Sequence, residues 1–260
     1  MCLVVVALDA HPRYALVVAA NRDEFHAREA VPAHWGALPP YAGVLAGRDL
    51  MAGGTWMGVR RDGRWALVTN VRDGRGNNPE APSRGELVPA ILNGDVAPAA
   101  ALAALHATAA IYNGFNMLAG EGNSATWMSN RVPRTNDLAQ GVHGLSNARL
   151  DTPWPKVTRT KAALSAWAGR GDAALSPLFA ALADRRQAPD ADLPATGVPL
   201  AWERLLSAPF IVSADYGTRC STVLAIDRGG SAVLVERSFD AAGIAVGEAR
   251  FEFDVPPRSA

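Results

Sequence analysis

Two apolar runs near the N-terminus constrain the fold most strongly. The segments CLVVVALD (2–9) and YALVVAAN (14–21) are rich in β-branched residues, and the short polar stretch AHPR separates them. This pattern predicts an antiparallel hairpin. Both runs are almost continuously apolar rather than alternating, as is typical of strands that are buried on both faces. We therefore expect a layer of structure on each side of the sheet that contains this hairpin.

The rest of the chain alternates between strand-like and helix-like segments. The proline- and glycine-rich residues 29–47 are expected to form a loop, and Ser83 and Glu86 form a capping-box pattern ahead of a helix. The order of strands, helices, strands, helices and strands favours an α+β layered domain over a parallel βαβ fold. We expect residues 1–260 to form a single domain. The predicted strands are 55–60, 64–70, 115–130 with a glycine turn, 218–227, 231–239 and 247–255; the predicted helices are 87–94, 97–108, 154–169 and 173–185.

Composition and charge exclude several classes of protein. The 260 residues are 49% hydrophobic and carry a formal net charge of +0, with both signs interspersed. No basic patch joins aromatic residues, so nucleic acid is not an expected partner. No apolar run approaches the roughly 20 residues that span a bilayer, and no basic segment precedes the first apolar run. We expect a cytoplasmic protein without membrane insertion, whose partner is a small molecule.

Cys2 is the first candidate catalytic residue. Aminopeptidases remove an initiator methionine when the next residue is small, and loss of Met1 would place a thiol and a free α-amine on one residue. Such a residue is a nucleophile that carries its own base. The alternative is a packed thiol without chemistry, because free cysteine is among the most buried residue types. The only other cysteine, Cys220, is expected to be a core thiol, and a disulfide is not expected in a reducing compartment.

The hairpin brings a charged cluster to Cys2. In an antiparallel pair the end of the second strand returns to the start of the first, so Asn21, Arg22, Asp23 and Glu24 should lie near the thiol. A carboxylate there would orient the α-amine, and an arginine would favour the thiolate. The alternative is a solvated charged loop after a strand.

Three more polar residues are candidates for the site. Asn70 ends the predicted strand in LVTN, Asn147 follows a short apolar run in GLSN, and Arg219 precedes Cys220 at the head of an apolar strand. Asparagine side chains would supply neutral donors to a developing oxyanion, although each is also a common turn residue. Arg219 is either a second cation over the site or an edge charge. The five histidines show no metal-binding spacing, and no glycine-rich phosphate loop is present, so neither a metal nor a nucleotide cofactor is expected.

Taken together, these motifs resemble a known family. The sequence resembles the NRDE family, called transport and Golgi organisation proteins in eukaryotes, over nearly its whole length. That family is in turn similar to N-terminal-nucleophile (Ntn) hydrolases of the penicillin V acylase, bile-salt hydrolase and acid ceramidase group. The motifs that carry the resemblance are the Met-Cys start, NRDE (21–24), GGTWMG (53–58), LVTN (67–70), GLSN (144–147) and TRCSTV (218–223).

The resemblance implies a fold and a set of roles. It implies a four-layer αββα sandwich of two antiparallel sheets between helices, and an amidase or acylase that cleaves a C–N bond. The implied catalytic residues are Cys2 as nucleophile and base, Asp23 as holder of its amine, Asn70 and Asn147 around the oxyanion or substrate, and Arg219 for developing charge. Asn21, Arg22 and Trp56 are candidate substrate contacts. The acylases carry an arginine three residues before the aspartate, where this chain has Ala20.

The same family resemblance also implies two alternatives to hydrolysis. The family has been tied to haem trafficking and to lipid or acyl-CoA metabolism. The alternatives are therefore a haem-binding or haem-transfer protein on the same scaffold, or a protein that binds lipid or acyl-CoA. A hydrolase of this kind requires no cofactor, and haem would be a transported ligand that is held non-covalently, since no CxxCH motif is present.

Overall fold

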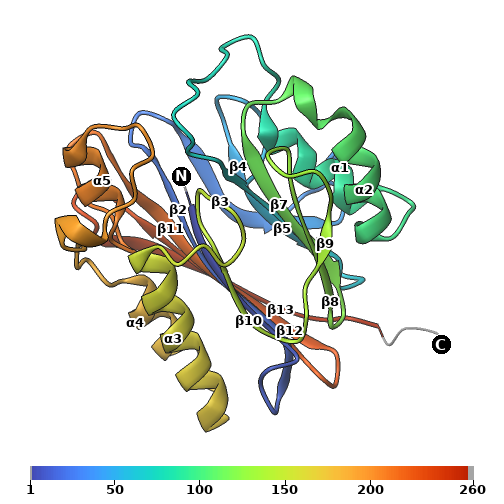
Figure 1. Cartoon of the computed structure of the whole chain (residues 1–260). Helices are drawn as coiled ribbons and strands as arrows, with labels where there is room; N and C mark the ends of the chain where they lie inside the picture. Colours follow the sequence, from blue (N-terminus) through green and yellow to red (C-terminus); the bar gives the residue numbers. More distant parts are fainter. Residues whose placement is uncertain (1, 257–260) are drawn as a thin grey trace.

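The computed structural model describes residues 2–256 and shows a layered α+β sandwich. Two antiparallel sheets pack face to face, α3 and α4 cover one sheet, and α1 and α2 cover the other (Figure 1). The predicted fold class is confirmed. Met1, and with it the predicted removal of that residue, lies outside the described residues. The helices are α1 (Leu87–Asn93), α2 (Pro98–Thr108), α3 (Pro155–Arg170), α4 (Ser176–Leu182) and α5 (Leu200–Leu206), with short 3-10 turns η1 (Arg84–Glu86), η2 (Ala109–Ile111) and η3 (Asp190–Asp192).

The first sheet contains the N-terminal hairpin at its centre. The predicted pairing is present, with Cys2 opposite Arg22 and Leu8 opposite Leu16. In spatial order this six-stranded sheet consists of β10 (Gly141–Leu145), β1 (Cys2–Leu8), β2 (Tyr14–Phe25), β11 (Tyr216–Asp227), β12 (Ser231–Phe239) and β13 (Ala245–Asp254).

The second sheet follows the order of the chain. Each of its strands pairs with the next, through hairpins and longer connections. In spatial order this seven-stranded sheet consists of β3 (Ala30–Trp35), β4 (Val44–Asp49), β5 (Met57–Arg60), β6 (Trp65–Asn70), β7 (Phe115–Glu121), β8 (Ser124–Ser129) and β9 (Asn136–Asp137).

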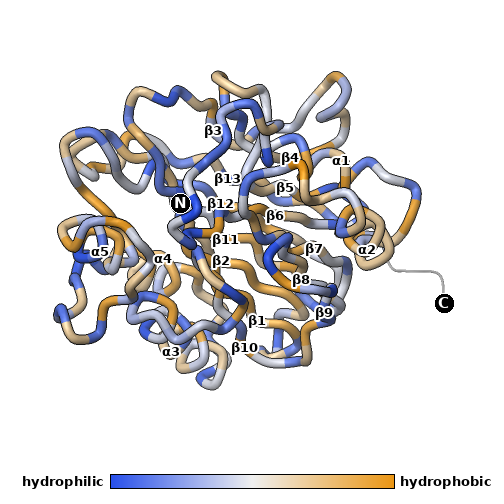
Figure 2. Tube along the Cα trace, turned by 45° about the horizontal axis from the view of Figure 1, so that its top comes forward, coloured by the Kyte–Doolittle hydropathy of each residue, from blue (hydrophilic) through white to orange (hydrophobic). Residues whose placement is uncertain are grey.

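The apolar residues of β1 and β2 separate into two sets by strand alternation. Val4 and Val18 belong to the core between the two sheets, whereas Val5 and Val17 pack against α3 and α4. A third cluster joins α1 and α2 to the outer face of the second sheet. Figure 2 shows the hydrophobic residues gathered along the strands and the hydrophilic ones in the surrounding loops. Burial on both faces explains why these strands are apolar throughout.

The prediction that residues 29–47 form a loop was wrong. They contain β3 and most of β4, which pair with a register shift between Val31 and His34, around Pro32. Proline is tolerated on an edge strand because its missing N–H can face outward, and β3 is an edge strand of its sheet.

The capping box was also predicted incorrectly in detail. The Ser83 hydroxyl caps η1 rather than α1, by accepting a bond from the Gly85 N–H at 3.3 Å. The Glu86 carboxylate does not reach back to Ser83 but accepts a bond from the Tyr112 hydroxyl at 2.7 Å. The segment therefore begins with a single tight turn that carries Arg84, and this turn is important for the site described below.

Three further elements differ from expectation. The helix expected at 173–185 is limited to α4, and neither α5 nor β10 was expected. No helix within residues 2–256 has the length and apolar character needed to cross a membrane.

Candidate active site

Residues from distant parts of the chain form a cavity of about 400 Å³ beside Cys2. β1 supplies Cys2, and the end of β2 supplies the charged cluster. The opposite wall is formed by the ends of β4 and β6 together with the loop segments 52–56 and 77–83. Five of the eight predicted site residues line this cavity: Cys2, Arg22, Asp23, Trp56 and Asn70.

Cys2 occupies the start of β1 with its side chain partly buried. The Ser146 hydroxyl donates to the Cys2 carbonyl at 2.9 Å, which ties the strand end to the segment after β10. Burial raises the pKa of the Cys2 thiol, and the nearby Arg22 charge partly opposes that rise. The thiol is therefore predominantly protonated at neutral pH and needs a base before it can attack a carbonyl.

Arg22 is the cation nearest to Cys2 in the sheet register. The two residues are directly paired across β1 and β2, so their side chains leave the same face of the sheet. The Arg22 guanidinium stacks 4.5 Å from the Trp56 ring centroid and lies 3.8 Å from the Asp49 carboxylate. Arg22 is 6% exposed, and its Nη1 atom has no hydrogen-bond acceptor among residues 2–256. A Cβ at Gly47 would overlap the Trp56 indole, so glycine there allows the stack.

Asp23 is buried beside the cavity, at the next position along β2. Its carboxylate accepts a bond from the Thr218 hydroxyl at 2.8 Å. Burial raises the pKa of Asp23, while the charge of Lys156 and the Thr218 bond act in the opposite direction. Lys156, at the start of α3, is 1% exposed, and its Nζ has no hydrogen-bond partner among the described residues. Burial lowers the pKa of Lys156, and the negative charge of Asp23 opposes this.

Asn21 does not reach the cavity. Its side-chain amide donates to the carbonyls of Leu182 and Pro209 at 2.9 and 2.8 Å and accepts from the Ser221 hydroxyl at 2.6 Å. These contacts lie on the helical side of the sheet. Asn21 therefore anchors α4 and the chain before β11 against β2.

Asn147 lies beneath the cavity wall rather than in it. Its side-chain amide donates to the Asn70 carbonyl at 2.9 Å, and its oxygen lies 3.2 Å from the Ser146 hydroxyl oxygen, whose proton is donated to the Cys2 carbonyl. Asn147 is fully buried, whereas Asn70 is partly exposed and lines the cavity. Asn147 thus joins the end of β6 to the segment that holds the Cys2 carbonyl.

Arg219 also lies outside the cavity. Its Nη1 donates to the backbone carbonyls of Phe25, His26 and Arg28, at 3.0 to 3.3 Å. It therefore shapes the turn after β2. Cys220 pairs with Arg22 on the side opposite Cys2, and both cysteines are free.

Sequence reasoning missed two cations near the thiol. Lys156 belongs to the helix that was predicted at 154–169 from its apolar spacing and from the proline and glycine near its ends, and Arg84 lies within the capping-box motif. The sequence feature that could have indicated Arg84 is the glycine that follows it. Gly85 lies in close backbone contact with Gly54, and this contact brings Arg84 to the cavity. No comparable signal in the sequence indicates that Lys156 is buried.

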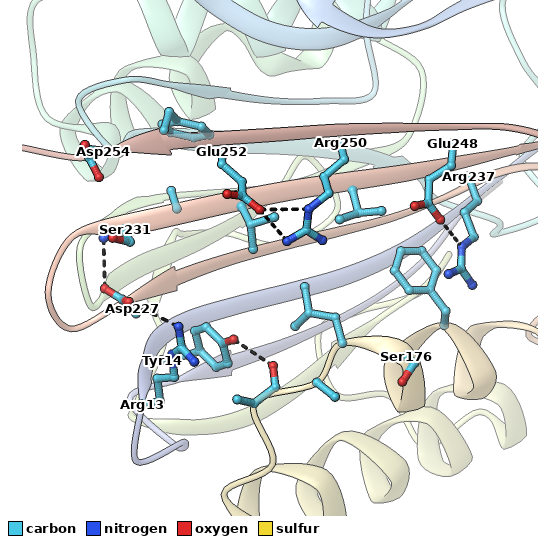
Figure 3. A pocket seen from close by; sticks show the side chains of 18 residues that line it. Arg13, Tyr14, Ser176, Asp227, Ser231, Arg237, Glu248, Arg250, Glu252 and Asp254 are labelled. Carbon is cyan, nitrogen blue, oxygen red and sulfur yellow. Dashed lines mark hydrogen bonds and ion pairs between the residues drawn. The ribbon is translucent and has the colours of Figure 1, made fainter.

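A larger cavity, of about 800 Å³, lies on the outer face of β12 and β13 (Figure 3) and shares no lining residue with the cavity beside Cys2. Its arginines are paired with carboxylates: Arg237 with Glu248, Arg250 with Glu252 and Arg13 with Asp227. These charges are satisfied without a ligand. Within residues 2–256, no group of three metal-ligating side chains comes together.

The four-layer sandwich of two antiparallel sheets between helices is an Ntn-hydrolase-like fold. It resembles a Caenorhabditis elegans N-acylethanolamine-hydrolyzing acid amidase ortholog, with a TM-score of 0.52 and 11% identity over 86% of this chain and 92% of that one. It also resembles a C2A mutant of conjugated bile acid hydrolase from Clostridium perfringens, with a TM-score of 0.52 and 9% identity over 98% and 92% of the two chains. At such identities the likeness shows the fold alone.

Sequence comparison is more specific than the fold. The chain belongs to the transport and Golgi organisation 2 family, whose sequence profile matches residues 1–241. A Bos taurus homologue of transport and Golgi organization protein 2 is 36% identical over an alignment that covers 92% of this chain and 93% of that protein. The Homo sapiens homologue is 32% identical with the same coverage. The family expected from the motifs is confirmed.

Proposed function

We propose that this protein is a cysteine amidase or acylase in which Cys2 attacks the carbonyl carbon of a small amide. The observation that carries the proposal is the pairing of Cys2 with Arg22 at one cavity, on the fold of the Ntn hydrolases. A nucleophile, a cation and a polar wall at one cavity are the parts that acyl transfer requires.

The first step needs a base for the protonated thiol. Removal of Met1 would give Cys2 a free α-amine, whose reference pKa is about 8. That amine accepts the thiol proton, and the sulfur forms a bond with the carbonyl carbon. The Asp23 carboxylate, held by Thr218, stabilises the resulting ammonium group.

In the second step, negative charge develops on the carbonyl oxygen of the tetrahedral intermediate and is lost again when the intermediate collapses. The Nη1 of Arg22, which has no hydrogen-bond acceptor among residues 2–256, and the Asn70 side chain serve as donors to this oxyanion. When the C–N bond breaks, the leaving amine takes the proton from the Cys2 ammonium, and a thioester remains. Water then hydrolyses the thioester, which releases a carboxylic acid and restores the thiol.

The polar lining favours hydrolysis over the haem and lipid alternatives. Arginine, asparagine and carboxylate side chains make up much of the wall, interrupted by Trp56, Val68, two prolines and four alanine or glycine residues, whereas a predominantly apolar pocket suits haem or acyl chains better. Haem transfer, lipid binding and a cytoplasmic location stay predictions. A haem carrier would show a saturable Soret shift near one haem per chain.

The decisive experiment compares wild type, Cys2→Ala and Cys220→Ala against a library of acyl amides. We expect Cys2→Ala to lose turnover by at least a thousandfold, because a nucleophile cannot be replaced by neighbouring groups. Cys220→Ala removes the other thiol and should keep activity. Equal turnover in wild type and Cys2→Ala would refute the proposal.

The intact mass of the purified protein tests the base. A mass lower by one methionine residue would show that Met1 has been removed and that Cys2 has a free α-amine. Only this form of the protein should be active. Activity in protein that retains Met1 would contradict the role of the α-amine.

A further inference from the structure

Arg84 lies where two cavities meet. The cavity beside Cys2 is adjoined by a second one of about 420 Å³, and four residues line both: Glu24, Asn70, Asn77 and Arg84. A molecule whose carbonyl reaches Cys2 has room to extend past Arg84 into the second cavity.

Arg84 differs from the other arginines around these cavities. Arg28 pairs with Asp49 at 2.6 Å, and Arg131 pairs with Asp73 at 2.8 Å. The Arg84 guanidinium donates to the Gly114 carbonyl at 3.0 Å and forms no ion pair with any residue between 2 and 256. Burial lowers the pKa of Arg84, and the positive charge of Arg28 adds to this effect. The negative charge of Glu24, which lines both cavities, opposes this effect without forming an ion pair with Arg84. A partly buried cation whose counter-charge stays beyond ion-pair distance is costly for a fold to keep.

The turn that carries Arg84 is fixed by close backbone contacts. The Ser83 hydroxyl accepts from the Gly85 N–H at 3.3 Å, and the Gly85 carbonyl accepts from the Thr55 N–H at 3.0 Å. A Cβ at Gly54 would lie 2.6 Å from the Gly85 backbone, so these two segments touch only because both residues are glycines. Arg84 therefore enters the cavity from a rigid support, which is what a specific ligand contact needs.

A second cation of the same cavity also has free donor capacity. Arg22 is more than nine-tenths buried, and its Nη1 has no hydrogen-bond acceptor among residues 2–256. Its nearest carboxylate, that of Asp49, already accepts the shorter bond from Arg28. Two guanidinium groups thus border one cavity with donors that the described residues do not use.

We propose that Arg84 binds an anionic group, a carboxylate or a phosphate, on the molecule whose carbonyl is attacked by Cys2. The inference rests on the proposed function, and it assigns a charge to the substrate. Guanidinium is well suited to the task because it donates two parallel hydrogen bonds to a planar carboxylate or to a phosphate. Arg22 remains with the reacting carbonyl, and Arg84 holds the anionic end.

The test uses Cys2 as a reporter of the local charge. Iodoacetate and iodoacetamide alkylate the same thiolate, so the ratio of their rates cancels any change in the thiol pKa. We take the rate with the anionic iodoacetate divided by the rate with the neutral iodoacetamide. We expect this ratio to be about three times as high for Cys2 in wild type as for N-acetylcysteine, because a positive charge several ångströms away attracts the anionic reagent. In Arg84→Gln the ratio should fall by about threefold. An unchanged ratio would overturn the proposal.

Two variants serve as controls for this ratio. Arg84→Lys keeps the charge and should keep most of the ratio, whereas loss in both variants would indicate a structural effect instead. Arg134→Gln removes an exposed arginine outside both cavities and should leave the ratio as in wild type.

Ligand binding without the thiol separates this proposal from the proposed function. Cys2→Ala protein is titrated calorimetrically with inorganic phosphate and with acetate, in the presence and absence of the Arg84→Gln change. Saturable binding that depends on Arg84 supports the anion site even if Cys2 proves inert, and the tighter of the two anions identifies the headgroup. Absence of binding for both anions, or equal binding after Arg84→Gln, would refute it.

Discussion

At the residue scale, the alternation of side chains along β2 separates two tasks. Arg22 leaves the sheet on the same face as Cys2, toward the cavity, whereas Asn21 binds α4 and the chain before β11 on the other face. Asp23 follows at the next position and is held by Thr218. At this strand end Asn21 therefore serves packing, whereas Arg22 and Asp23 both line the cavity.

Thr218 provides a test of how Asp23 is held. Its hydroxyl donates to the Asp23 carboxylate at 2.8 Å and accepts from the Ile211 N–H at 2.9 Å. We expect Thr218→Val to lower the free energy of unfolding by about 1–3 kcal/mol, because the shape is kept while buried polar groups lose a partner. Thr218→Ser keeps the hydroxyl and should cost clearly less. Urea denaturation measures both, and equal costs would contradict a role for the hydroxyl.

Some site residues could be predicted from the sequence because their proximity is local. Twenty residues of hairpin are enough to return Arg22 and Asp23 to Cys2, and hairpin pairing needs no knowledge of the rest of the chain. Arg84 and Lys156 could not be placed in this way. Their approach to Cys2 depends on how a glycine contact and a helix pack against distant strands.

At the element scale, Glu236 connects the two sheets. It lies on β12, and its carboxylate accepts from the Ala33 N–H of β3 at 2.7 Å and from the Thr222 hydroxyl of β11 at 3.0 Å. Glu236 is only 2% exposed, and burial raises its pKa above the ordinary 4.5, against the effect of these bonds. The sheets are thus linked by a carboxyl group whose protonated form is favoured more in the folded protein than in the unfolded chain.

This preference predicts a pH dependence of stability. A carboxyl group with a raised pKa in the folded state stabilises the fold fully below its unfolded pKa, and this contribution is lost as pH rises through the folded pKa. Glu236→Gln keeps an acceptor for the Ala33 N–H but cannot ionise. We therefore expect the stability of wild type relative to Glu236→Gln to fall as the pH is raised from 4 toward 8. Urea unfolding at several pH values measures the difference, and a constant or rising difference would contradict the assignment.

The limits of sequence reasoning at this scale follow from the sequence separation of pairing partners. The strands β1 and β2 are adjacent in the chain, and their antiparallel pairing was predicted, although the register comes from the structure. β10 pairs with β1 through contacts such as Val4 with Leu145, and a short segment with so distant a partner carries little local signal. Residues 29–47 were misread for a related reason, since Pro32 is acceptable only because β3 lies at an edge.

At the scale of the whole molecule, the core between the sheets supports the cavity. The strands that carry Cys2, Arg22 and Asn70 all continue into that core, through Val4, Val18 and Leu67 respectively. The site is therefore held by the rigid middle of the sandwich, although its walls are loops. A loss of packing between the sheets should consequently lower the free energy of unfolding, and the site should be lost when the protein unfolds.

Leu224 tests this dependence on the shared core. It lies on β11, is fully buried, and belongs to the cluster between the sheets. Leu224→Ala should lower the free energy of unfolding by about 2–5 kcal/mol, because a cavity is left where both sheets meet. Leu38→Ala is the matched control, since Leu38 is 76% exposed and its removal should change stability by no more than about 0.5 kcal/mol. Denaturation followed by circular dichroism measures both, and a cost below about 1 kcal/mol for Leu224→Ala would show that the sheets are not held together by this core.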